Sequence, residues 1–228
     1  MIIEGPLINA TFIERPNRFI TIIEINGELH RSHLPDPGRL KELLTPNARL
    51  LVRPAPEASG RKTSFSTVMV EHKGQLISLV STLPNKFIDY ALKNNKIPVL
   101  RPYSFVRSEI TVKNHRFDFL LNDNKANKFY LEVKSVTLVE NGIAKFPDAI
   151  TRRGMNHAKA LMNLVSKGFQ AGILFVCQRP DAISFSPMWD RDPKFAMALI
   201  DAYKAGVKVW CITLNISKTE ISFKQQIP

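Results

Sequence analysis

The sequence has few cysteines and no long apolar run, and each absence excludes a class of protein. Only Cys177 and Cys211 occur among 228 residues, so neither a disulfide-rich scaffold nor a zinc site with the usual cysteine spacing is expected. No leading apolar segment with a basic flank is present, and no stretch is apolar enough to cross a bilayer. We therefore expect a cytoplasmic protein with no membrane partner and with two reduced, buried cysteines.

Acidic residues are scarce, and the resulting positive charge is unevenly distributed. The chain has 32 basic and 20 acidic residues, a net charge of +12. Ten basic and eight acidic residues precede Leu83, which leaves a net charge of +10 for the remainder. Such an excess attracts polyanions, of which nucleic acid is the commonest. The alternative interpretation is a charged surface that only favours solubility or heat tolerance.

The first part of the chain contains six short apolar segments that predict strands. They are residues 8–13, 19–25, 28–33, 49–53, 67–70 and 76–80. Asn26-Gly27 and Lys73-Gly74 are typical of hairpin turns, and residues 38–44 suggest one short helix. This pattern predicts a small closed β-barrel of the OB-fold type.

OB-fold barrels often bind nucleic acid through aromatic and basic residues on one face. Phe19 and the cations Arg15, Arg18 and Arg39 are candidates for that DNA-binding face. Core packing or a solvated rim is the alternative for each of these residues.

The remainder predicts an α/β domain. A helix over 84–94, strands over 106–112, 117–121 and 128–136, a helix over 149–167 and a strand over 172–177 give the order α-β-β-β-α-β. A further helix over 193–205 and strands over 207–214 and 220–223 extend it. This order is that of a restriction-endonuclease-like core. We therefore predict a two-domain α/β (α+β) protein, with an OB-like barrel over residues 1–82 and a nuclease-like domain over 83–228.

Three charged residues lie on the predicted hairpin of this second domain. Asp118 is on one strand, and Glu132 and Lys134 share one face of the next strand because side chains alternate. This spacing is the PD-(D/E)XK nuclease pattern, in which Asp118 and Glu132 would hold Mg²⁺ or Mn²⁺ and Lys134 would orient the attacking water. Because the pattern also occurs by chance, a solvated strand face is the alternative.

The helix over 149–167 combines an apolar stripe with basic faces. Met155, Ala158, Met162 and Val165 have the spacing of a face that packs on the sheet. Four other residues are candidates for holding the DNA backbone: Arg152, Arg153, His157 and Lys159. His157 could also carry a proton, and the alternative is a solvated helix with a surface histidine.

Four sequence blocks together resemble the sugar fermentation stimulation protein A family. They are Ser32-His-Leu-Pro-Asp-Pro-Gly-Arg-Leu40, Leu131-Glu-Val-Lys-Ser-Val-Thr-Leu138, Phe146-Pro-Asp-Ala149 and Thr151-Arg-Arg-Gly154 with His157. The resemblance implies an N-terminal OB-like domain, a C-terminal nuclease-like domain and DNA binding without marked sequence preference. The resemblance also implies that Asp118, Glu132 and Lys134 occupy the acidic and lysine positions of the nuclease-like site. It adds Glu109 as a further acidic position and an extra metal ligand. Bacterial members commonly have Cys-Pro-Asn-Thr-Gly where this chain has Leu34-Pro-Asp-Pro-Gly38.

Three functions are compatible with these residues. The first is a nuclease that cuts DNA with Mg²⁺ or Mn²⁺. The second is a non-catalytic DNA-binding regulator, for which the family name suggests sugar or maltose genes, and the third is a small-molecule phosphoesterase. No helix-turn-helix marks an operator-binding protein. A homodimer is compatible with the sequence. The residues do not distinguish DNA from RNA, single from double strands, or endonuclease from exonuclease action.

Overall fold

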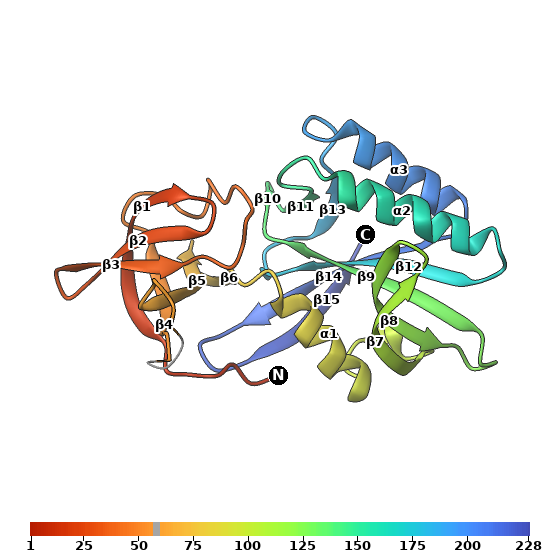
Figure 1. Ribbon diagram of the computed structural model, residues 1–228, viewed down its shortest axis with the longest axis horizontal. Helices are drawn as coiled ribbons and strands as arrows, with labels where there is room; N and C mark the ends of the chain where they lie inside the picture. Colours follow the sequence, from red (N-terminus) through yellow and green to blue (C-terminus); the bar gives the residue numbers. More distant parts are fainter. Residues whose placement is uncertain (57–59) are drawn as a thin grey trace.

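The computed structural model describes residues 1–56 and 60–228, which form a β-barrel and an α/β body side by side (Figure 1). The barrel contains β1 (Ile8–Asn17), β2 (Ile20–Ile25), β3 (Glu28–His33), β4 (Arg49–Pro54), β5 (Phe65–His72) and β6 (Gln75–Ser78). Its strand order is β3-β2-β1-β4-β5-β6, and β3 also pairs with β5. That pairing closes five strands into a barrel, as predicted, with β6 added at one edge.

The barrel has no helix where the sequence suggested one. Residues 38–44 form turns, and Leu40 has a φ of 52°, a left-handed value that a helix cannot contain. Leu40, Leu43 and Leu44 nevertheless contribute to the barrel core. Their spacing therefore reflects burial in a turn rather than a helical face.

The second body is built on a six-stranded sheet. Its strands are β7 (Ser104–Val112), β8 (His115–Asn122), β9 (Lys128–Val136), β12 (Gln170–Cys177), β14 (Lys208–Ile216) and β15 (Ile221–Ile227), in the order β15-β14-β12-β9-β8-β7. Strands β9, β12 and β14 are parallel, and the outer pairs are antiparallel. Three central parallel strands need apolar residues on both faces, which explains the runs Ile173–Cys177 and Cys211–Leu214.

Helices cover both faces of this sheet. Helix α1 (Leu83–Lys93) and the short η2 (Pro98–Leu100) pack on one face, and α2 (Arg152–Val165) and α3 (Pro193–Lys204) pack on the other (Figure 1). The predicted order α-β-β-β-α-β is confirmed by α1, β7, β8, β9, α2 and β12, with only short elements between α1 and β7 and between β9 and α2. Thr151 caps α2 by accepting a hydrogen bond from the Gly154 N–H at 3.0 Å, so the helix begins three residues later than predicted.

A small sheet of β10 (Val139–Glu140), β11 (Ile143–Phe146) and β13 (Ser184–Pro187) was not predicted. Its strands have only two to four residues, too few for an alternation pattern to be visible. It lies beside α2 where the second body meets the barrel (Figure 1).

The two bodies are joined by more than the chain between β6 and α1. The Asp148 carboxylate accepts hydrogen bonds from the backbone N–H groups of Arg39 and Leu40 in the barrel. Residues 1–3 pair with residues 219–221 at the start of β15, where the Ile3 N–H donates to the Thr219 carbonyl at 2.8 Å. The segment before the barrel therefore packs on the second body. None of the described helices is long and apolar enough to cross a membrane.

Candidate active site

The candidate site forms where β8 and β9 separate. The two strands pair from Asn122↔Lys128 to Phe119↔Leu131, and Asp118 follows directly. There the Asp118 carboxylate replaces the backbone ladder, because its Oδ2 accepts the Val133 N–H at 2.7 Å. Its Oδ1 accepts a hydrogen bond from Asn85 Nδ2 of α1 at 2.6 Å. Asp118 is thus fixed between the two strands by groups from β9 and α1.

Glu132 is buried on the α2 side of the sheet, and its two carboxylate oxygens differ sharply. Oε1 accepts hydrogen bonds from Lys134 Nζ and from His157 Nδ1, both at 2.5 Å. Oε2 is buried and has no hydrogen-bond partner among the described residues. A buried carboxylate oxygen without a donor is costly unless a cation or water completes it. This oxygen therefore marks an incomplete site.

The pKa values of Asp118 and Glu132 are shifted in opposite directions. Burial and the nearby charge of Glu132 raise the pKa of Asp118 from 3.8 to about 6. Burial also acts to raise the pKa of Glu132, but the His157 hydrogen bond and the Lys134 charge outweigh it, so that pKa is lowered. Glu132 is therefore ionised at neutral pH, and an ionised carboxylate can only accept. His157 Nδ1 must then carry the proton in this hydrogen bond.

The structure corrects the prediction that His157 faces DNA. Its side chain is only 6% exposed and points from α2 into the sheet toward Glu132. The buried face of α2 contains Gly154, His157, Ala158, Leu161 and Leu164. The predicted stripe of Met155, Ala158, Met162 and Val165 does pack on the core, but only Ala158 is fully buried and the other three are partly buried. His157, Leu161 and Leu164 do have helical spacing, but a histidine is normally counted as polar.

Asn85 was not predicted. It lies on α1, 33 residues before Asp118, and no local pattern connects the two. Only the packing of α1 on the sheet brings its amide to the carboxylate.

Glu109 is not brought into this cluster. Its side chain is exposed and lies 3.7 Å from Arg116 Nη1, and its backbone φ is 54°. In the described part of the chain, no group of three or more His, Cys, Asp and Glu side chains surrounds a metal position. A cation here would instead have Asp118 and Glu132 as its protein ligands, with water or substrate in the other positions, as is common for Mg²⁺.

The predicted DNA-binding cations fall into two groups. Five are exposed: Arg18, Arg39, Arg152, Arg153 and Lys159. Arg15 is not available, because its guanidinium donates to the carbonyls of Arg39 and Arg18 at 2.7 and 2.8 Å. Burial also lowers the pKa of Arg15. We therefore assign Arg15 to the scaffold of the barrel loops rather than to a DNA-binding face.

A closed OB barrel followed by an α/β domain with clustered carboxylates defines the class of two-domain proteins with an OB module and a restriction-endonuclease-type module. Residues 13–79 match the family described as "SfsA N-terminal OB domain", and residues 82–220 match "Sugar fermentation stimulation protein RE domain". The chain belongs to the sugar fermentation stimulation protein family.

Relatives are similar over the whole chain. The sugar fermentation stimulation protein homologs of Clostridium tetani and Clostridium botulinum are 37% and 41% identical over 227 residues, covering 100% of this chain and 98% of each relative. Among solved structures, Pyrococcus furiosus SfsA in complex with Ca²⁺ is 28% identical, with a TM-score of 0.88 over 100% of this chain and 96% of that one. The family and the two-domain fold are therefore established.

Proposed function

We propose that this protein is a divalent-metal-dependent phosphodiesterase that acts on DNA without marked sequence preference. The observation that carries the proposal is the buried, unpartnered Oε2 of Glu132 near the Asp118 carboxylate. Two carboxylates in a buried site repel each other unless a cation lies between them. The Ca²⁺ in the Pyrococcus furiosus relative supports a cation site in this family.

The donor set fits a hard divalent cation such as Mg²⁺ or Mn²⁺. Asp118 and Glu132 supply only carboxylate oxygens, and the neighbouring nitrogens of Lys134 and His157 are hydrogen-bond donors rather than ligands. When bound, the metal would supply a water of lowered pKa and neutralise charge on the phosphate. Asp118 and Glu132 would hold it.

The remaining side chains act by position. His157 and Asn85 fix the two carboxylates from opposite faces of the sheet. Lys134 Nζ, whose side chain is 13% exposed, can reach both Glu132 and an incoming phosphate. An ammonium there can orient the attacking water and stabilise the charge that develops on the phosphate oxygens.

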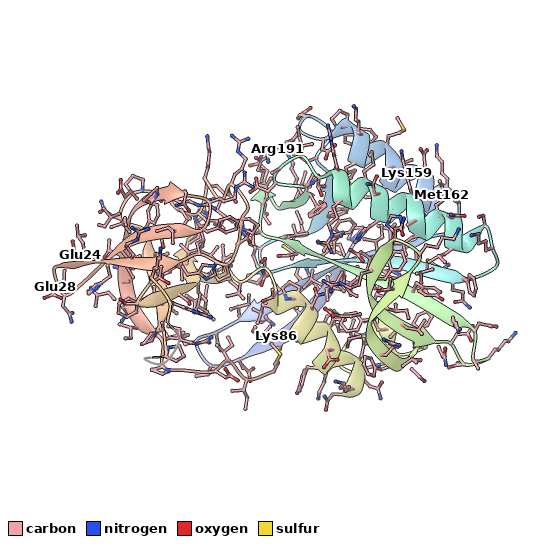
Figure 2. All side chains as sticks on the ribbon, viewed as in Figure 1. Glu24, Glu28, Lys86, Lys159, Met162 and Arg191 are labelled. Carbon is pink, nitrogen blue, oxygen red and sulfur yellow. The ribbon has the colours of Figure 1, made fainter. Side chains whose placement is uncertain are left out.

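Charge supports DNA as the substrate. Arg152, Arg153 and Lys159 are exposed on α2, the helix that also carries His157. In Figure 2, Arg191 lies at the barrel end of α2 and Lys159 farther along that helix, whereas Glu24 and Glu28 lie at the far tip of the barrel. The exposed cations of α2 therefore offer a surface for a DNA backbone that lies away from those barrel acids.

The test is cleavage of plasmid and of single-stranded DNA by the purified protein with Mg²⁺ or Mn²⁺. We expect Glu132→Gln and Lys134→Ala to lower the rate at least about 100-fold, since each removes charge from the reacting phosphate's surroundings. Lys128→Ala, an exposed lysine at the other end of β9, is the matched control and should keep the rate. Cleavage that persists in the Lys134→Ala protein would contradict the proposal.

A second candidate is a DNA-binding regulator that does not cut. It is favoured by the position of Glu109, which leaves two carboxylates rather than three at the site. In that case binding should depend on salt but be unaffected by metal or by Glu132→Gln. Metal-independent binding without any cleavage would support this candidate over the nuclease.

A further inference from the structure

A cavity of about 320 Å³ lies between the barrel and the second body. The barrel side contributes Arg18 and the loop 36–38, and Ser81 lies in the connection to α1. The second body contributes residues 135–138, which include the end of β9, and residues 145–149 and 151. The volume lies at the lower end of the range for sites that bind small organic groups.

This cavity adjoins the candidate active site. Ser135 follows Lys134 on β9 and Thr137 comes directly after the strand, so at a rise of about 3.3 Å per residue Thr137 lies within about 10 Å of Lys134. Thr151, another lining residue, caps the helix whose His157 holds Glu132. A strand with one phosphate at the carboxylates would therefore have a neighbouring nucleotide within reach of the cavity.

The walls are held rigidly. Asp148 accepts the Leu40 N–H at 3.2 Å and binds Arg191 Nη1 at 3.0 Å, so it ties the barrel loop to the second body. Asp36 Oδ1 accepts the Gly38 N–H at 2.8 Å, and burial raises the pKa of Asp36. Both carboxylates accept hydrogen bonds that hold the barrel loop, and the Arg191 guanidinium offsets the charge of Asp148. These hydrogen bonds fix the walls of the cavity from both the barrel and the second body.

The lining combines features that suit one nucleotide. Val136, Leu138, Phe146 and Pro147 provide apolar walls for a flat base. Ser81, Ser135, Thr137 and the exposed Arg18 are the polar residues of the lining that could contact a nucleotide, although Ser81 Oγ already donates to the Pro35 carbonyl and Ser135 Oγ accepts from Gln178. A base inside a duplex cannot reach such a recess, because its edges are paired and its faces are stacked.

An exposed isoleucine stands at the rim. The side chain of Ile150 is 75% exposed. The backbone on both sides of it is fixed, because the Thr151 N–H donates to Asp192 Oδ2 at 2.8 Å and Asp148 binds the Arg191 guanidinium. Arg152 and Arg153 follow directly. An apolar side chain held out rigidly beside cations is the arrangement by which proteins insert between base steps.

We propose that the cavity receives one unpaired nucleotide of a DNA strand, with Ile150 against the neighbouring base. The proposal rests on the proposed action on DNA and specifies its substrate: DNA with an unpaired nucleotide next to the scissile phosphate. A fully paired duplex would bind through its backbone alone.

The test is binding in EDTA, where no cleavage occurs, to a paired duplex and to the same duplex with one extra unpaired nucleotide. A 2-aminopurine beside the extra nucleotide reports unstacking by its fluorescence. We expect the unpaired nucleotide to tighten binding about tenfold, within the range for contact with one base. Ala149→Trp, at an exposed lining position, should abolish that preference by filling the cavity while leaving affinity for the paired duplex within about twofold.

Ile150→Ser should reduce the fluorescence change, and Ile183→Ser is its matched control, since Ile183 is 68% exposed elsewhere on the second body. Equal affinity of the wild-type protein for both duplexes, or a preference that survives Ala149→Trp, would overturn the inference. Binding of a free mononucleotide that Ala149→Trp abolishes, without any preference among the duplexes, would also overturn it in favour of a small-molecule site. Because the binding assay contains no metal, its outcome is independent of whether the protein cleaves DNA.

Discussion

At the scale of single residues, the asymmetry between the two oxygens of Glu132 indicates the role of His157. Lys134 and His157 both bind Oε1, which leaves Oε2 free to face a cation. A histidine that holds a ligand carboxylate in this way affects metal affinity without touching the metal. His157 is therefore a positioning residue in our proposal.

Replacing His157 tests this role. We expect His157→Leu to weaken Mn²⁺ binding about 10- to 100-fold, as measured by calorimetric titration. His157→Asn should restore most of the affinity, because the Asn Nδ2 can donate from nearly the same position as the ring Nδ1. His115→Asn is the control, since its ring lies 6.0 Å from that of His157 and is not bonded to Glu132 in the described structure. Equal affinities in the Leu and Asn variants would contradict the positioning role.

Asp118 provides a second residue-scale prediction. Its folded pKa of about 6 lies above the ordinary 3.8, so the folded protein binds this proton more tightly than the unfolded chain does. Without metal, the stabilisation from protonated Asp118 is complete below pH 4 and is lost as the pH rises to 6. A shift of this size corresponds to a decrease in the free energy of unfolding on the order of 3 kcal/mol.

Denaturant unfolding at pH 4 to 7 measures this loss. The decrease should be smaller in Asp118→Asn, which has no carboxylate to ionise at this position, while other buried carboxyls such as Asp36, whose pKa is also raised, still contribute. Mn²⁺ competes with the proton, so its affinity for the wild-type protein should rise through pH 6. If the free energy of unfolding changes with pH in the same way in the wild-type protein and in Asp118→Asn, the pKa of Asp118 is not raised.

At the scale of elements, the segment between β11 and α2 couples the barrel to the helix that carries His157. Asp148 accepts two barrel N–H groups and the Arg191 guanidinium. Its replacement by Ala would leave these donors unpaired, which costs about 1–3 kcal/mol for each group that stays buried. We expect Asp148→Ala to loosen the barrel and raise the radius of gyration in small-angle scattering.

The matched variant for this prediction is Asp148→Asn. Its amide oxygen can still accept the loop N–H groups, so it should retain the compact form better than the Ala variant does. If Asp148→Ala scatters identically to the wild-type protein, the junction is held by other contacts, such as those of residues 1–3 along β15.

Helices and strands were predicted correctly from the sequence where their apolar residues form a clear local pattern. Alternation located the barrel strands, where one face is buried, whereas apolar segments bounded by turn residues located the β8–β9 hairpin, in which β9 is buried on both faces. It failed at residues 38–44, where buried leucines form a turn, and at β10, β11 and β13, which are too short. The trio of Asp118, Glu132 and Lys134 was visible from spacing, whereas Asn85 and the inward direction of His157 depend on tertiary packing.

At the scale of the whole molecule, the order of elements predicted both bodies, but not how they meet. The domain limits of 1–82 and 83–228 stay a prediction; β6 ends at Ser78 and α1 begins at Leu83, while residues 1–3 pack on the second body. Contacts such as that of Asp148 with the barrel loop span more than 100 residues, and no periodicity reports them. The interdomain cavity was invisible in the sequence for the same reason.

The last prediction concerns the positive charge of the second body. If the exposed cations of α2 contact DNA phosphates, binding must weaken with salt, because each contact releases condensed counterions. Replacing Arg152, Arg153 and Lys159 together with Ala should lower the slope of log K against log salt concentration by about 0.9 for each lost contact, or roughly 3 in total. Fluorescence anisotropy at several salt concentrations measures it.

A control with the same change in charge separates local contact from a general field. The exposed residues Lys73, Lys96 and Lys218 lie in turns and loops outside α2, and their joint replacement by Ala removes the same number of charges. We expect that variant to keep nearly the wild-type slope, since phosphates beyond about 10 Å from a charge are screened at 0.1 M salt. Equal losses of slope in the two triple variants would mean that DNA is attracted by net charge and that α2 is not the binding surface.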